Sequence, residues 1–100
     1  MNENNSSTQE QDNKNILFQN VPNPFNQKTE IKFQIDSENF RSASIIVFDM
    51  NGLLIKEFEI MDSGEGSVHI DSGDLKAGMY IYSLIVNQRE FDTKRMILMK

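Results

Sequence analysis

The apolar residues after position 15 recur at every second position in short runs, and this spacing restricts the chain to β-structure. In the clearest run, Ile31, Phe33 and Ile35 alternate with polar residues. Alternation of this kind marks a strand with one buried face and one solvated face. No segment shows the three- and four-residue spacing of an amphipathic helix over ten or more positions. We therefore predict an all-β fold.

A hairpin is predicted in the middle of the chain. Residues 42–50 form a continuous β-branched and aromatic run, which predicts a central strand covered on both faces. The Asn51-Gly52 dipeptide follows directly and favours a type I′ turn, since both residue types accept positive φ angles. Residues 53–60 are the predicted returning strand. Residues 62–66 are predicted to form a loop before a short strand around Val68 and Ile70.

A second hairpin is predicted near the end of the sequence. Residues 79–86 form a strand, and Asn87-Gln88 turns the chain into a last strand at 89–99. One side of the first strand carries the apolar and aromatic side chains Tyr80, Tyr82, Leu84 and Val86. In total the pattern predicts about six or seven short antiparallel strands, an arrangement typical of an immunoglobulin-like β-sandwich.

The first 15 residues differ from the rest in composition. They contain no apolar residue after Met1, so they cannot bury enough area to offset the entropy of ordering. We predict that residues 1–15 form a disordered linker or leader and that residues 16–100 form one folded domain. The start of the chain lacks the basic and apolar regions of a secretory signal. If the domain is exported, we expect that signal on another part of a longer protein.

Charge and cysteine content exclude several classes of protein. The formal net charge is −5, so the chain lacks the basic patch that drives nucleic-acid binding. No apolar run is long enough to form a transmembrane segment. The sequence contains no cysteine, which excludes disulfides and thiolate metal sites.

Signals for catalysis are almost absent. His69 is the only histidine, and it lies between Val68 and Ile70, so we expect it to face solvent if they face the core. No serine lies in a Gly-x-Ser-x-Gly turn, and no Gly-rich phosphate loop occurs. We predict that the chain is not an enzyme and needs no cofactor.

Two binding sites were weighed against simpler explanations. Acidic residues near the Gly-rich loops could bind Ca²⁺, but their spacing is not that of an EF-hand and turns favour the same residues. These residues are Asp62, Glu65, Asp71 and Asp74. Phe25, Tyr80 and Tyr82 could form a sugar-stacking platform, although aromatic residues in strands are more often part of the core. We therefore predict no metal site.

The last seven residues combine basic and apolar side chains. Lys94, Arg95 and Lys100 flank the apolar run 96–99. The simpler interpretation is a final sandwich strand with basic ends. The functional interpretation is a strand displayed to a receptor, because a free strand edge or a chain terminus is a ready recognition element.

Five sequence elements occur in a characteristic order. A proline-containing segment, residues 17–26, precedes the alternating run that starts at Thr29, and an apolar strand then leads to Asp49-x-x-Gly52. Leu75 and Gly78-x-Tyr80 follow, and a basic pair, an apolar strand and a lysine form residues 94–100. Together these elements resemble the type A C-terminal sorting domain of the type IX (Por) secretion system, over residues 16–100.

The resemblance implies a C-terminal secretion signal that directs an upstream passenger domain across the outer membrane. The expected partners are the outer-membrane secretion machinery and a sortase-like peptidase. The expected location is the periplasm in transit and then the cell surface or the medium, as part of a longer protein. The resemblance assigns recognition to Lys94, Arg95 and Lys100. It assigns framework roles to Pro22, Asn23, Pro24, Asp49, Gly52, Gly78 and Tyr80.

The alternative function is a structural or adhesive β-sandwich appendage of a longer surface or fibre protein. It predicts contacts between copies and no dependence on Lys100.

Overall fold

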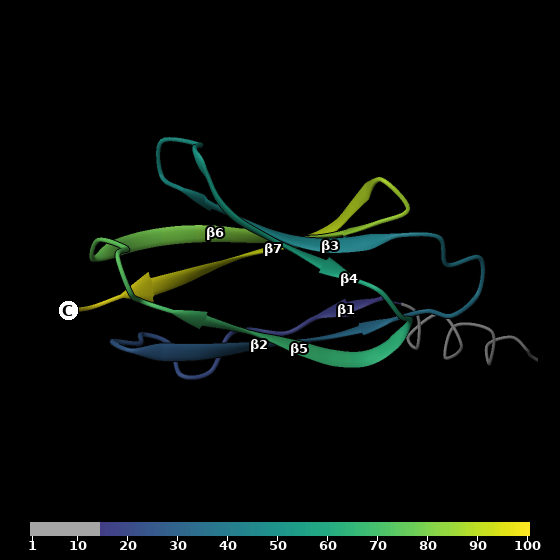
Figure 1. Cartoon of the computed structure of the whole chain (residues 1–100), viewed down its shortest axis with the longest axis horizontal. Coiled ribbons are helices and arrows are strands. Elements are labelled where there is room, and N and C mark those ends of the chain that lie inside the picture. The colour runs from purple at the N-terminus through teal and green to yellow at the C-terminus, as the bar shows by residue number, and fades with distance from the viewer. Residues whose placement is uncertain (1–14) are drawn as a thin grey trace, which may run out of the picture.

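The computed structural model describes residues 15–100, which form two antiparallel sheets packed face to face (Figure 1). The smaller sheet has the order β1 (Ile16–Leu17), β2 (Lys28–Ile35) and β5 (Gly64–Asp71). The larger sheet has the order β4 (Leu54–Ile60), β3 (Ala43–Asp49), β6 (Gly78–Val86) and β7 (Arg89–Leu98). The predicted all-β sandwich is confirmed, and the predicted linker lies outside the described residues except for Asn15.

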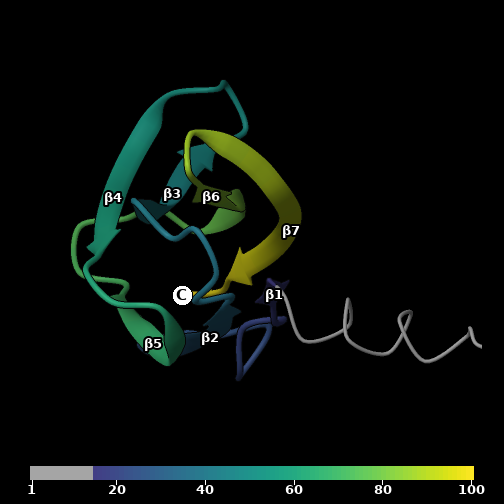
Figure 2. The same cartoon turned by 90° about the vertical axis from the view of Figure 1, so that its right-hand side faces the viewer.

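The core lies between the sheets and is built by one face of each strand. Every second residue of β2 is buried, namely Thr29, Ile31, Phe33 and Ile35. The four β6 residues predicted to share one side are buried as well, namely Tyr80, Tyr82, Leu84 and Val86. Figure 2 shows the larger sheet curving so that β4 approaches β5 and β7 approaches β1 around this core. No helix that could cross a membrane occurs among the residues described.

β3 is a central strand, but only one of its faces is fully covered. Ala43, Ile45 and Val47 are buried in the core, whereas Ile46 and Phe48 are half-buried on the outer face. The prediction that both faces are covered is therefore wrong. A two-layer sandwich has no third layer to cover the outer face of either sheet. The outer apolar residues of β3 are therefore partly exposed to solvent.

The turn between β6 and β7 consists of the two predicted residues. Asn87 and Gln88 both have positive φ, 50° and 70°, as a two-residue type I′ turn requires. The Asn87 side chain also ties this turn to the segment before β3. Its Oδ1 accepts the backbone N–H groups of Arg41 and Ser42, and its Nδ2 donates to the Asn39 carbonyl.

The turn between β3 and β4 differs from the prediction. Only Gly52 has positive φ, 84°, and the connection extends from Met50 to Leu53. The Asp49 carboxylate accepts the backbone N–H groups of Asn51 and Leu53, each at 2.9 Å. This aspartate turn satisfies two backbone donors and replaces the tight type I′ turn. Asp49 and Gly52 thus shape a longer loop than the sequence predicted.

β5 begins earlier than predicted, because Gly64–Gly66 pair with β2 rather than forming a loop. Gly66 lies opposite Phe33, and a Cβ at Gly66 would lie 2.7 Å from Cζ of that ring. The buried Phe33 ring therefore occupies the space that a side chain at position 66 would need. A glycine inside a strand commonly marks such a close approach.

Gly66→Ala is expected to destabilise the domain by about 1–3 kcal/mol, because the added methyl group displaces Phe33 from its packed position. Urea unfolding of both proteins measures the change. Ser67→Ala, an exposed neighbour on β5, is the matched control and should stay within about 0.5 kcal/mol of wild type. A Gly66→Ala protein as stable as the control would contradict the packing argument.

Candidate functional site

Both edges of the C-terminal half of β7 are hydrogen-bonded. One edge pairs with β6. The other edge contacts residues 19–26, here called the proline segment, through a parallel bridge between Phe25 and Leu98. The Phe25 N–H donates to the Ile97 carbonyl at 2.9 Å, and the Met99 N–H donates to the Phe25 carbonyl at 2.8 Å. The first and last parts of the described chain are therefore joined along the backbone.

Two side chains of the proline segment extend this pairing. Asn23 Oδ1 accepts the Ile97 N–H at 2.9 Å, and Gln19 Nε2 donates to the Arg95 carbonyl at 2.7 Å. A free strand edge, one of the two recognition elements that the sequence suggested here, is therefore absent at residues 95–99. A binding partner could therefore reach the side chains on the outer face of β7 but not a free backbone edge.

Side chains near the end of β7 point alternately into the core and out to solvent. Met96 and Leu98 are fully buried, with 0% and 1% of their surface exposed. Arg95, Ile97 and Met99 point to the other side and are exposed. We call these three residues the outward stripe. It places one cation in line with two apolar side chains.

The three predicted recognition residues do not form one patch. Lys94 lies on the opposite side of β7 from Arg95, with its Nζ 3.5 Å from Asp92 Oδ2. Lys100 Nζ donates to the Gly73 carbonyl at 2.9 Å, which holds the side chain over the loop after β5. Arg95 alone of the three belongs to the outward stripe. Ile97 and Met99 were missed, although the alternation of residues 95–99 signals their exposure.

Beneath the proline segment lies a buried polar network centred on Asn20, which is 1% exposed. Its Nδ2 donates to the Pro22 carbonyl at 3.0 Å and to Thr29 Oγ1 at 2.9 Å, and its Oδ1 accepts from Gln19 Nε2 at 2.7 Å. Thr29 Oγ1 in turn donates to the Pro22 carbonyl at 2.8 Å. Buried polar groups are stable only with such partners, so this network fixes the path of the proline segment.

Tyr82 connects this network to the larger sheet. Its hydroxyl accepts the Asn20 N–H and donates to the Phe18 carbonyl, each at 2.8 Å. Burial raises the pKa of Tyr82 to about 12; the hydrogen bond from the Asn20 backbone opposes this shift, and the charge of Asp92 adds to it. The hydroxyl therefore stays protonated and donates at physiological pH.

The structure places the other predicted framework residues in or near turns and segment contacts. Pro22 supplies a carbonyl acceptor to the buried network, and Pro24 lines a shallow hollow with Met99 and Lys100. The Tyr80 hydroxyl donates to the Lys76 carbonyl at 2.6 Å and closes the turn that leads into β6. Gly78, the first residue of β6, has a φ of 148°. Asn20 and Thr29 were not assigned a role from sequence, although Thr29 is a polar residue on the inward side of an alternating strand.

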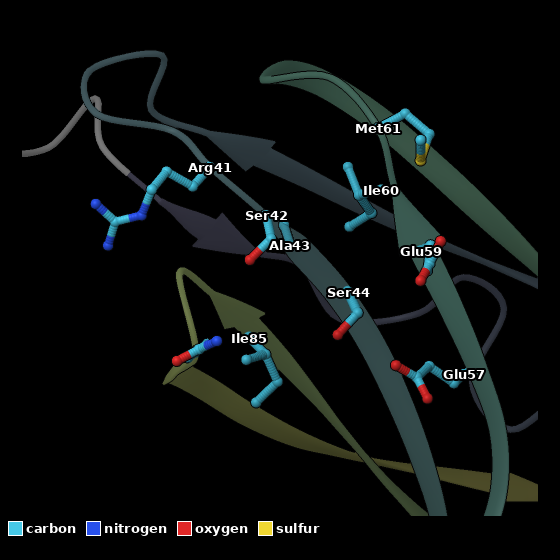
Figure 3. A pocket seen from close by; sticks show the side chains of 10 residues that line it. Arg41, Ser42, Ala43, Ser44, Glu57, Glu59, Ile60, Met61 and Ile85 are labelled. Carbon is cyan, nitrogen blue, oxygen red and sulfur yellow. The ribbon is translucent and has the colours of Figure 1, made fainter.

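A separate hollow on the larger sheet has no arrangement that suggests catalysis (Figure 3). Glu57 and Glu59 project from β4 beside Ser44 of β3, whereas the Arg41 guanidinium points away from both carboxylates. The sequence's one histidine, His69, lies on the other sheet, solvent-exposed as predicted, and is 3.9 Å from Glu30. The two serines in the hollow, Ser42 and Ser44, therefore have no imidazole base there.

The two alternative binding sites considered from sequence are not assembled. Within residues 15–100, no three His, Asp or Glu side chains gather as they would around a metal ion. Phe25, Tyr80 and Tyr82 are all buried, so they form part of the core rather than a stacking surface.

Comparison with models of protein families identifies the family of this chain. The model of the secretion system C-terminal sorting domain matches residues 20–99. The chain belongs to this family. The type IX sorting domain predicted from the residues is thereby confirmed, and the matched range contains all seven framework residues and β2–β7. The searches of curated proteins and of solved structures found no match.

Membership gives the sorting domain a role at a coarse level. It is a C-terminal secretion sorting signal, and it implies export toward the cell surface or the extracellular space as part of a longer protein. Domains of this family interact with secretion machinery and are generally non-catalytic.

Proposed function

We propose that this sorting domain directs an upstream passenger across the outer membrane by the type IX route, and that the secretion machinery recognises the outward stripe together with Lys100. The family match over residues 20–99 carries the proposal. In transit the protein would pass through the periplasm, and a sortase-like peptidase would then separate passenger and domain.

The chemistry of the outward stripe suits protein recognition. Arg95 offers a planar set of N–H donors that fits a carboxylate, and Ile97 and Met99 add apolar area beside it. Lys100 supplies a second cation near the same end of β7. An acidic surface with an apolar groove is the partner that this combination fits best.

Lys94 is assigned a smaller role in this proposal than Arg95 and Lys100. Its ammonium group faces Asp92 on the other side of the strand, so a receptor that binds the outward stripe does not reach it directly.

The test is a reporter fusion with a Sec signal and a fluorescent protein placed before residues 1–100. Deleting residues 94–100 would remove Met96 and Leu98 from the core and confound folding with recognition. The sharper variant is Arg95→Glu combined with Lys100→Glu, which reverses two surface charges. We expect surface reporter to fall about tenfold, the effect of losing a charged contact.

Arg41→Glu is the matched control, because it reverses an exposed arginine at the opposite end of the larger sheet. It should leave export unchanged. Each fusion is compared in a strain with working type IX machinery and in a strain without it. Reporter held in the periplasm of both strains, with a folded domain, would favour the structural or adhesive appendage instead.

A further inference from the structure

The outward stripe lies on a segment whose outer backbone edge is fixed entirely by the proline segment. On that edge, the backbone groups of residues 95, 97 and 99 form hydrogen bonds with Gln19, Asn23 and Phe25. The Asn23 and Ile97 partners are 74 residues apart in sequence, and the Gln19 and Arg95 partners are 76 apart. Residues near the start of the domain therefore control the conformation of its last residues.

We propose that Asn23, assisted by Gln19, is a positioning residue for the outward stripe, so that the sorting signal consists of two segments distant in sequence. The inference rests on the proposed function of the stripe. Asn23 holds the Ile97 N–H through a side-chain oxygen, and Phe25 holds the next two backbone groups. Together they keep Arg95, Ile97 and Met99 aligned on one face.

Positioning matters because the end of β7 has little else to restrain it on this side. Beyond Leu98 the sheet pairing with β6 ends, so Met99 is held by the Phe25 carbonyl alone among the backbone groups. A receptor that binds aligned side chains gains affinity when the alignment exists before binding. Without the bond from Asn23, the stripe would lose part of that order.

Asn23 is a suitable residue for the test, because it is exposed. Asn23→Ala removes the acceptor while leaving the buried Phe25 in place. Asn23→Asp keeps an oxygen that can accept the Ile97 N–H and serves as the rescuing variant. Asn26→Ala is the matched control, since Asn26 is exposed in the same segment.

The first measurement is amide hydrogen exchange of the 100-residue chain. In Asn23→Ala the Ile97 amide should exchange about tenfold faster, while the global free energy of unfolding falls by no more than about 1 kcal/mol. Asn23→Asp and Asn26→Ala should retain wild-type exchange at Ile97. Unchanged exchange in Asn23→Ala would overturn the inference and leave the proposed function untouched.

The second measurement is export of the same variants in the reporter fusion. We expect about fivefold less surface reporter for Asn23→Ala and normal export for Asn23→Asp and Asn26→Ala. Faster exchange with normal export would overturn the positioning role, because the receptor would then be indifferent to alignment. Failure of the wild-type domain to export would overturn the proposed function, and the positioning role with it, while the exchange result would still show the contact itself.

Discussion

Asn20→Ala is expected to destabilise the domain by about 3–4 kcal/mol, a large share of the stability of a small domain. The substitution deletes a side chain that is 1% exposed and bonds to three other residues. It leaves Thr29 Oγ1 and Gln19 Nε2 each without one partner, and it opens a small cavity under the proline segment. The loss of these three hydrogen bonds accounts for most of the cost.

Chemical denaturation of wild type and Asn20→Ala measures this loss. The control is again Asn26→Ala, an exposed asparagine of the same segment, which should cost less than about 0.5 kcal/mol. A loss below about 1 kcal/mol for Asn20→Ala would contradict the structure, because single exposed hydrogen bonds already reach that value.

The second large effect concerns pH and the buried hydroxyl of Tyr82. Its folded pKa is about 12, whereas an unfolded tyrosine titrates near 10. Between these values the unfolded chain has released the proton and the folded domain retains it, so the folded state binds more protons. Stability is therefore fully present below pH 10 and falls as pH rises toward 12, by about 2–3 kcal/mol in total.

Tyr82→Phe should remove this alkaline component and also lower stability at neutral pH by about 1–3 kcal/mol, since the Asn20 N–H and the Phe18 carbonyl lose their partner. The free energy of unfolding is measured from pH 7 to 12 for wild type and Tyr82→Phe, and the difference between the two proteins is taken at each pH. Tyr80→Phe is the matched control, and its stability should still fall between pH 10 and 12, because Tyr82 is intact in that variant. If the free energy of unfolding of Tyr82→Phe still fell by the same amount between pH 10 and 12, the alkaline loss of stability would not come from Tyr82.

Local sequence pattern predicted most of the strands, because alternation is a property of neighbouring residues. The inward side of β2 is the one expected from positions 31–35, and the inward residues of β6 are four that were predicted to share one side of that strand. The turn at Asn87-Gln88 was also correct, since its geometry depends on those two residues alone.

The errors lie where a distant or neighbouring side chain changes the local outcome. The Asp49 carboxylate bonds two backbone groups and lengthens a turn that Asn51-Gly52 would otherwise close tightly. Gly66 lies in a strand because it pairs with Phe33, far away in sequence. The outer face of β3 is apolar without being covered, which a run of hydrophobic residues does not reveal.

The candidate site was predictable in part. The basic residues at 94, 95 and 100 stand out in the sequence, and alternation could have separated Lys94 from Arg95. The contacts of Asn23 and Gln19 with β7 span more than 70 residues, so no local pattern indicates them. The same holds for the bond between Asn20 and Tyr82, which spans 62 residues.

The sandwich has a polarity along its length. β1, the first described strand, begins toward one end of the two sheets, whereas Lys100 lies at the other end (Figure 1). In the proposed function, a passenger joined before β1 would therefore lie at the end of the sandwich opposite to Lys100. The proposal therefore implies that a large passenger need not cover Lys100.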